Sequence, residues 1–133
     1  MKVGVIGLGK AGLPLSAVIA DSGMDVVGVE EKKKRVKDIN NSVNPIPEET
    51  GLQEIMDKHI GNNLKAVSSI DKAIDCNVYV IIVPLFIDEN KQPDFTILKS
   101  AFEDVASVLN DDDLVVLETT VPHGTTEEKF KKI

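Results

Sequence analysis

Three glycines near the amino terminus constrain the fold of this chain more than any other feature. They lie in Gly7–Gly12, a Gly-Leu-Gly-Lys-Ala-Gly motif between the apolar run Lys2–Ile6 and a segment of helical spacing. In such a strand–turn–helix unit, the first glycine allows a tight turn, the second lets a pyrophosphate approach the backbone, and the third lets the helix pack closely. The helix start adds free amides and a partial charge of about +0.5. The motif therefore predicts a phosphate-binding turn, although an ordinary glycine turn would share the pattern.

An acidic residue at the end of the second apolar run favours a dinucleotide ligand. Glu30 follows Asp25–Val29, where a dinucleotide-binding fold uses a carboxylate to accept the hydroxyls of the adenosine ribose. Because a carboxylate there repels the extra phosphate of NADP, we predict that the cofactor is NAD. The basic run Lys32–Arg35 could neutralise a phosphate, but the solvated first turn of a helix explains most of it. We expect Arg35 alone to reach the ribose.

Short runs rich in Val and Ile alternate with segments of helical spacing along the chain. We expect strands at Lys2–Ile6, Asp25–Val29, Leu64–Val67, Val78–Val83 and Leu114–Leu117. We expect helices at Ala11–Asp21, Lys33–Asn40, Leu52–His59, Ile70–Ile74 and Phe95–Leu109, and loops at Asn40–Glu49 and Asp88–Pro93. Several runs are apolar without alternation, which is typical of strands buried on both faces. The pattern predicts an α/β fold with a doubly wound parallel sheet, right-handed crossovers and the Rossmann strand order 3-2-1-4-5.

Composition narrows the class of protein. The 133 residues suit a single domain, which we place over residues 1–133, and a formal charge of -7 opposes binding to nucleic acid. The apolar stretches are too short for a membrane span, and Lys10 and the glycines interrupt what a secretory signal would need as its apolar core. The one cysteine, Cys76, forms no internal disulfide and suits a reducing cytoplasm, where we expect the protein to reside.

The cysteine and the histidines are weak candidates for chemistry. We interpret Cys76 as a small buried thiol because no histidine lies near it in sequence, and His59 as a surface residue beside Lys58. His123, in the loop after the last predicted strand, could approach the cofactor. Two histidines so far apart in sequence predict no metal site.

Two loops leave the predicted sheet at the carboxyl ends of its strands, where an open parallel sheet binds its ligand. Val83–Phe86 follows the fourth strand, and Glu118–Gly124 follows the fifth. A plain proline stop would also explain the first loop, and threonines acting as turn caps would explain the second. Beyond them, Thr125–Glu128 has the Thr-x-x-Glu form of a capping box that opens a helix. Because no glycine or proline stops that helix before Ile133, we expect the sequence to be the front of a longer protein.

Several further segments carry a family resemblance. The glycine motif extends over Val5–Pro14, and it is accompanied by Gly28–Glu30, Val36–Asn40, Pro45–Leu52, Val83–Pro84, Pro93–Phe95 and Glu118–Glu127. As a set, these segments resemble the nucleotide-sugar dehydrogenases, which oxidise a UDP- or GDP-sugar twice at C6 to the uronate with two NAD. The resemblance implies that this chain is the amino-terminal NAD-binding domain of such an enzyme. It also implies that the UDP-sugar substrate and homo-oligomer formation belong to the full-length protein.

The resemblance assigns roles to individual residues. It implies that the amides around Gly9 to Gly12 hold the pyrophosphate, that Glu30 and Arg35 contact the adenosine ribose, and that Thr120 lies near the nicotinamide and the catalytic water. Thr120 is the one catalytic candidate in this chain. The residues expected to contact the cofactor are Gly7, Leu8, Gly9, Lys10, Ala11, Gly12, Glu30, Arg35, Val83, Pro84, Leu85 and Thr120.

Some residues depart from the family's usual pattern. Lys10 replaces an aromatic residue, and Glu30 replaces the commoner aspartate. Thr50 replaces the proline of Glu-Pro-Gly-Leu, and Leu85 replaces the threonine of Val-Pro-Thr-Pro, which removes one expected hydrogen bond to the cofactor. Glu118 resembles the branch that acts on UDP-N-acetylhexosamines more than the UDP-glucose branch, where lysine is usual.

Two alternative interpretations share the glycines and the acid. An NAD-sensing regulatory domain of a potassium transporter has a similar length but no use for Pro93–Phe95 or Glu118–Pro122. A dehydrogenase of the 3-hydroxyacid or 6-phosphogluconate type shares the Gly-Leu-Gly motif but depends on a serine or threonine loop and a lysine further on. In the nucleotide-sugar family, the catalytic cysteine and most of the sugar pocket lie beyond the end of this chain. We therefore expect the fragment alone to be inactive.

Overall fold

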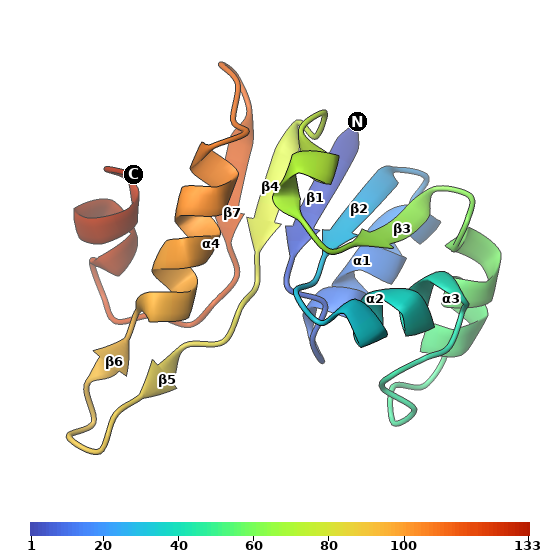
Figure 1. The fold of residues 1–133 in the computed structure, drawn as a ribbon, viewed down its shortest axis with the longest axis horizontal. Coiled ribbons are helices and arrows are strands. Elements are labelled where there is room, and N and C mark those ends of the chain that lie inside the picture. The colour runs from blue at the N-terminus through green and yellow to red at the C-terminus, as the bar shows by residue number, and fades with distance from the viewer.

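The computed structural model describes residues 1–133 and contains a five-stranded parallel sheet flanked by helices (Figure 1). Its strands are β1 (Lys2–Ile6), β2 (Asp25–Val29), β3 (Leu64–Val67), β4 (Val78–Ile81) and β7 (Leu114–Leu117). They are arranged in the order β3-β2-β1-β4-β7, and every neighbouring pair is parallel. Because β7 is the fifth strand of this sheet in chain order, the predicted order 3-2-1-4-5 is confirmed.

Helices connect the strands. They are α1 (Gly12–Asp21), α2 (Lys33–Asn40), α3 (Leu52–His59), α4 (Thr96–Ala106) and two short helical segments, η1 (Ile70–Ala73) and η2 (Thr126–Phe130). A two-stranded antiparallel hairpin, β5 (Phe86–Ile87) and β6 (Pro93–Asp94), projects from the sheet between β4 and α4 (Figure 1). The loop expected at Asp88–Pro93 forms most of the turn of this hairpin. None of the helices is long and apolar enough to cross a membrane.

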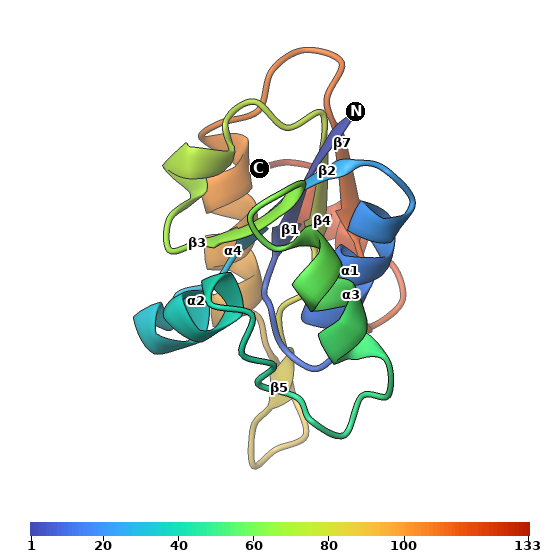
Figure 2. The same cartoon turned by 90° about the vertical axis from the view of Figure 1, so that its right-hand side faces the viewer.

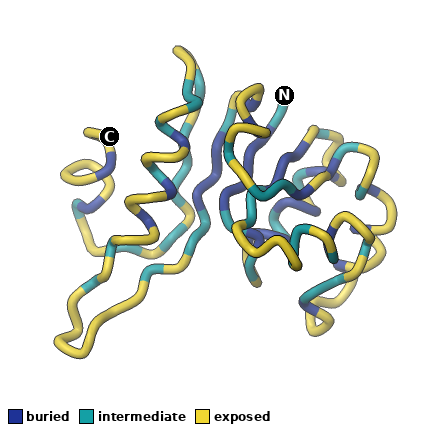
Figure 3. The backbone as a smooth tube through the Cα atoms, viewed as in Figure 1, coloured by how far each residue is buried: buried dark blue, intermediate teal, exposed yellow.

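Alternation along the strands produces a separate core on each face of the sheet. Figure 2 views the sheet nearly along its plane and shows α1 and α3 on one side and η1 and α4 on the other. On the first side, Val3 and Val5 of β1 belong to a cluster completed by α1, α2 and α3. On the second side, Ile6 belongs to a cluster with η1, α4 and Phe130 of η2. Figure 3 shows the central strands buried and the hairpin exposed.

The structure corrects three local predictions. The fourth strand ends at Ile81, two residues before the predicted end at Val83, because the chain turns away toward the hairpin there. The segment at Ile70 is a short 3-10 helix. The capping box is wrong, since Thr125 is already helical, with φ -55° and ψ -45°, and makes no capping hydrogen bond. Gly124, with φ 80°, makes the turn, and its carbonyl accepts the amide of Glu128 at 3.0 Å.

Candidate functional site

The glycine motif connects β1 to α1 at the carboxyl edge of the sheet, and its three glycines differ in their surroundings. Gly7 has φ 99°, and a Cβ there would lie 2.7 Å from the carbonyl oxygen of Ile82. A Cβ on Gly12 would collide with the carbonyl oxygen of Gly7, whereas a Cβ on Gly9 would meet nothing within 4 Å. Gly7 and Gly12 are therefore required by the turn and the packing. Gly9 leaves open space in front of the backbone.

The backbone amides of this loop are free. None of Leu8, Gly9, Lys10, Ala11 and Gly12 donates its amide to an acceptor in the chain, while the amides on either side, of Gly7 and Leu13, are both bonded. Consecutive unpaired amides at the start of a helix form an anion site, because the donors and the helix dipole favour the same negative charge. The loop can thus hold a pyrophosphate through its backbone.

Leu8 and Arg35 hold this loop in place. The Leu8 side chain is buried and covers Gly28 of β2, where a Cβ would lie 2.6 Å from the Leu8 Cδ2. The Leu8 carbonyl accepts a hydrogen bond from the Arg35 Nη1 at 3.0 Å. The structure therefore brings Arg35 from α2 to the glycine loop, as a ribose contact requires; that contact itself stays a prediction.

Glu30 lies in the turn between β2 and α2. Its amide donates to the carbonyl of Val67 at 2.9 Å, and its Oε1 accepts the amide of Lys32 at 3.0 Å. The carboxylate is therefore kept at the carboxyl edge of β2, half-buried and beside the loop that follows β1. The predicted acid and the predicted glycines come from adjacent strands of the sheet.

An ion pair that sequence patterns did not predict joins the glycine loop to the loop before α3. The Lys10 Nζ lies 3.0 Å from the Glu48 Oε1, and the Lys10 side chain is 83% exposed. The backbone amide of Glu48, followed by the Lys10 ammonium, holds the pKa of the Glu48 carboxyl below its usual range. Because both groups are exposed, the pair adds little to stability.

The loops after β4 and β7 meet at the same edge. The Thr119 Oγ1 donates to the carbonyl of Val83 at 2.6 Å and so ties the two loops together. Thr120 is exposed just past the end of β7, Pro84 is exposed, and Leu85 is half-buried. Sequence reasoning missed Thr119 because the resemblance directed attention to Thr120. The only available signal was a second threonine beside it.

The interpretation of His59 as a surface residue is wrong. Its side chain is 8% exposed, its Nε2 lies 2.8 Å from the Asp21 Oδ1, and its Nδ1 lies 2.7 Å from the Asn63 Oδ1. Packing of α3 against the end of α1 buries it, and no local pattern encodes that contact.

Cys76 is buried as expected, and burial raises the pKa of its thiol, so it is a poor nucleophile. His123 is exposed in its loop.

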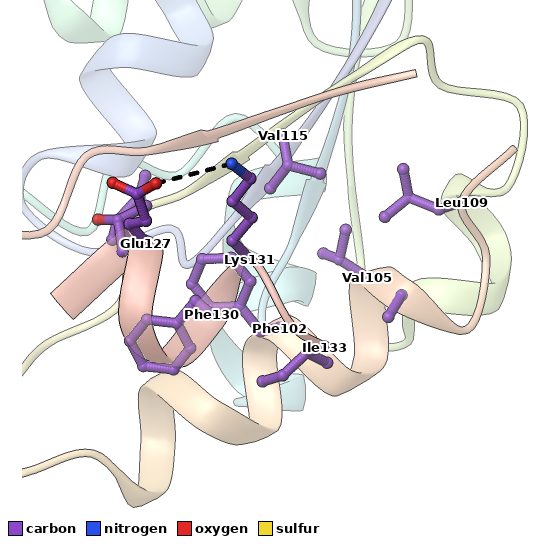
Figure 4. Close-up of a pocket in the computed structure, with 11 residues that line it drawn as sticks. Phe102, Val105, Leu109, Val115, Glu127, Phe130, Lys131 and Ile133 are labelled. Carbon is purple, nitrogen blue, oxygen red and sulfur yellow. Dashed lines mark ion pairs between the residues drawn. The ribbon is translucent and has the colours of Figure 1, made fainter. Parts of the chain in front are cut away.

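An open apolar groove of about 540 Å³ lies elsewhere, between α4, β7 and η2 (Figure 4). Phe102 and Phe130, which stack with ring centroids 4.4 Å apart, contribute to its lining together with Val105 and Ile133. No residue predicted to contact the cofactor lines this groove. The candidate site is therefore the polar carboxyl edge of the sheet and not this apolar groove.

Comparison with known proteins gives a consistent result. Residues 1–133 match the model of the NAD binding domain of the UDP-glucose/GDP-mannose dehydrogenase family. The chain is 43% identical over 129 residues to the UDP-N-acetyl-D-glucosamine 6-dehydrogenase of Salmonella typhi, covering 97% of this chain and 29% of that protein. It is 34% identical over 135 residues to the UDP-N-acetyl-D-mannosamine dehydrogenase of Methanocaldococcus jannaschii, covering 99% of this chain and 31% of that protein.

Solved structures agree with these relatives. The UDP-D-ManNAc dehydrogenase of Pyrococcus horikoshii superposes with a TM-score of 0.91 at 34% identity, covering 96% of this chain and 30% of that one. The GDP-mannose dehydrogenase of Pseudomonas aeruginosa superposes with a TM-score of 0.89 at 23% identity, over 96% of this chain and 30% of that one, and shows the fold alone. The chain thus spans about a third of the length of these relatives.

Proposed function

The chain belongs to the UDP-glucose/GDP-mannose dehydrogenase family as its NAD-binding domain, and on this premise we propose that it holds NAD across the carboxyl edge of its sheet. The observation that carries the proposal is the run of free amides from Leu8 to Gly12 in front of the open position at Gly9. Family membership favours this function over the regulatory domain of a potassium transporter and over a 3-hydroxyacid or 6-phosphogluconate-type dehydrogenase.

The cofactor would lie along the sheet edge in a defined direction. The pyrophosphate binds the glycine-loop amides, and the adenosine ribose bonds to Glu30, with Arg35 beside it at the Leu8 carbonyl. Glu30 follows β2 and the loops of Val83 and Thr120 follow β4 and β7, which lie on the opposite side of β1 from β2. The nicotinamide half therefore extends toward Val83, Pro84, Leu85 and Thr120.

We place the chemistry in a longer protein of which this chain is one domain, residues 1–133. Bound NAD supplies a hydride acceptor, and the chain's own contribution is to orient the nicotinamide, with Thr120 on that side of the site. The only cysteine, Cys76, is buried in the core and does not serve as the thiol of a dehydrogenase. We propose that this chain alone turns over no substrate, and that the complete enzyme is a homo-oligomer in the cytoplasm.

For the substrate we propose a UDP-N-acetylhexosamine, oxidised at C6. Two observations support this choice. Glu118 stands where the UDP-glucose branch usually has lysine. The relatives in Salmonella typhi and Methanocaldococcus jannaschii are named for UDP-N-acetyl-D-glucosamine and UDP-N-acetyl-D-mannosamine.

Calorimetry with NAD and with NADP tests the cofactor site. Hydrogen bonds to a charged acceptor contribute about 1.5 to 3 kcal/mol, so Glu30→Ala should weaken NAD binding roughly tenfold or more and relieve the repulsion of NADP. Glu31→Ala is the matched control, because Glu31 is exposed and its side chain has no partner. A wild-type chain that prefers NADP would contradict the assignment of Glu30.

Incubation of the 133-residue chain with NAD and a panel of UDP-sugars tests where the chemistry lies. We expect no rise in NADH absorbance, because nucleophilic catalysis needs a reactive thiol that this chain lacks. The full-length enzyme of Salmonella typhi with UDP-N-acetyl-D-glucosamine is the positive control. Measurable turnover by the chain would show that the catalytic groups lie within these residues.

A further inference from the structure

The hydrogen-bond ladder between β4 and β7 stops at the edge of the candidate site. The amide of Leu114 donates to the carbonyl of Asn77, and the amide of Glu118 donates to the carbonyl of Ile81, both at 2.9 Å. Rungs of a parallel ladder recur at every second residue on each strand. In this register the next rung would join the amide of Val83 to the carbonyl of Glu118, and the one after it would join the amide of Thr120 to the carbonyl of Val83. Both hydrogen bonds are absent.

A side chain occupies the acceptor of the second of these missing rungs. The Thr119 Oγ1 donates to the carbonyl of Val83 at 2.6 Å, so the acceptor that Thr120 would have used is already taken. Thr119 is half-buried, and Thr120 is exposed. The amide of Thr120 has no acceptor in the chain. The Thr119 hydroxyl therefore pairs with the Val83 carbonyl at the end of the sheet, and the backbone amide of Thr120 stays unpaired.

We infer that Thr119 is a positioning residue that occupies the Val83 carbonyl just past the end of the ladder and thereby keeps the Thr120 amide free for the nicotinamide half of NAD. The carboxamide oxygen is the hydrogen-bond acceptor of the nicotinamide ring, and a free backbone amide complements it without adding charge. The ligand in this inference rests on the proposed function. The end of the ladder, by contrast, is a property of the free chain.

The hydroxyl is the only part of Thr119 that this role needs. Thr119→Val keeps nearly the same shape but leaves the Val83 carbonyl without its donor, and an unpaired half-buried carbonyl draws the nearest free donor. The Thr120 amide is the donor that the register of the two strands would pair with this carbonyl. Thr119→Ser keeps the hydroxyl and should keep the ladder end as it is.

Hydrogen exchange and calorimetry together test the inference. The exchange rate of the Thr120 amide is measured by NMR in ¹⁵N-labelled chain without NAD, and the NAD affinity is measured by calorimetry. In the wild type the amide should exchange near its intrinsic rate and become protected when NAD binds. In Thr119→Val the amide should be protected at least about tenfold without NAD, and NAD affinity should fall about three- to tenfold.

Two further variants sharpen the test. Thr119→Ser should behave as the wild type in both measurements. Thr126→Val is the matched control, because Thr126 is exposed at the start of η2 and its side chain makes no hydrogen bond; it should change neither. If Thr119→Val does not fold, Thr119→Ala, which also removes the hydroxyl, takes its place in both measurements.

Several results would overturn it. A Thr120 amide already protected in the free wild type would show that the rung is present. A loss of NAD affinity in Thr119→Val without new protection of the Thr120 amide would refute the role of Thr119 in keeping that amide free. A wild-type chain that binds no NAD would instead reject the proposed function, while exchange in the free chain would still test the ladder.

Discussion

At the carboxyl edge of the sheet, the amides from Leu8 to Gly12 have no acceptor in the chain, whereas at the amino edge the buried ring of His59 is bonded through both nitrogens. One edge holds a row of unused donors beside open space. At the other edge, the His59 ring and the Asn63 side chain are bonded within the chain. Both edges belong to the same five strands.

The amino edge is organised around Asn63, just before β3. Its Nδ2 donates to the carbonyls of Ala20 at 2.8 Å and Met24 at 2.9 Å, which leaves its Oδ1 to face the His59 Nδ1. The His59 Nε2 in turn faces Asp21, at the end of α1. These bonds join the ends of α1 and α3 to the start of β3.

The difference follows from solvent access. An unpaired amide at the surface keeps its hydrogen bond to water, so it costs little and a ligand can replace the water. A buried polar group without a partner loses that bond and destabilises the fold. Substitutions at the carboxyl edge should therefore act mainly on NAD affinity, and substitutions at the amino edge mainly on the free energy of unfolding.

Gly12→Ala should have the largest effect and should change both stability and NAD affinity, because Gly12 packs against the sheet and also lies in the loop proposed to hold the pyrophosphate. A Cβ there collides with the Gly7 carbonyl oxygen and lies 2.9 Å from the Ile82 Cγ2. Backbone cannot move as a side chain can, so we expect a loss of about 3 kcal/mol in urea unfolding, together with loss of NAD binding.

Gly9→Ala is the matched variant on the same loop. A Cβ on Gly9 meets nothing within 4 Å, so unfolding should change by no more than about 0.5 kcal/mol. NAD affinity should nevertheless fall, because the new methyl group occupies the approach of the pyrophosphate. Equal destabilisation by the two substitutions would refute the distinct roles given to these glycines.

Asn63→Ala should lower the free energy of unfolding and leave NAD affinity unchanged, the reverse of Gly9→Ala. It removes the donors to Ala20 and Met24 and the acceptor for His59, and we expect a loss of about 2 to 3 kcal/mol in unfolding free energy. NAD affinity should stay unchanged, because the residue lies at the opposite edge of the sheet. Asn62→Ala is the control, since its exposed side chain has no partner. A marked loss of NAD affinity in Asn63→Ala would contradict the different roles given to the two edges of the sheet.

Thr120→Val should lower NAD affinity and leave the stability of the fold unchanged. The substitution is nearly isosteric and Thr120 is exposed, so thermal unfolding should be unaffected. Loss of one hydrogen bond should weaken NAD binding by about 0.5 to 1.5 kcal/mol in calorimetry. In a full-length enzyme the same change should lower kcat more than it raises KM. An unchanged kcat would assign Thr120 a purely structural role.

The smallest expected effect is the loss of a part of the unfolding free energy at low pH. The Lys58 side chain, followed by the His59 ring, donates to the Asp21 carboxylate and holds its pKa below 3.8. The resulting stabilisation is complete above about pH 3.8 and is lost as the pH falls through the lower pKa of the folded state. Asp21→Asn should therefore be less stable than the wild type at about pH 6, and urea unfolding should show this gap narrowing toward about pH 2. A gap that widens in acid would contradict this linkage.

Much of the fold and part of the site follow from local sequence patterns. The periodicity of Val and Ile runs predicted the five sheet strands, and the glycines with Glu30 predicted a loop and an acid on adjacent strands. These features are local, because strand and helix periods and the needs of a tight turn depend on a few neighbouring residues. The β5–β6 hairpin escaped prediction because its strands are only two residues long.

What the sequence by itself determined is the strand–helix alternation, the Rossmann strand order and the glycine turn between β1 and α1. Only the tertiary structure decided that His59 is buried against Asp21, that Lys10 pairs with Glu48, and that Thr119 bonds to the Val83 carbonyl. Each of these contacts joins residues more than thirty positions apart. The packing of α3 on α1 and the register of β4 against β7 bring such partners together, and these are properties of the assembled sheet and helices that no short segment encodes.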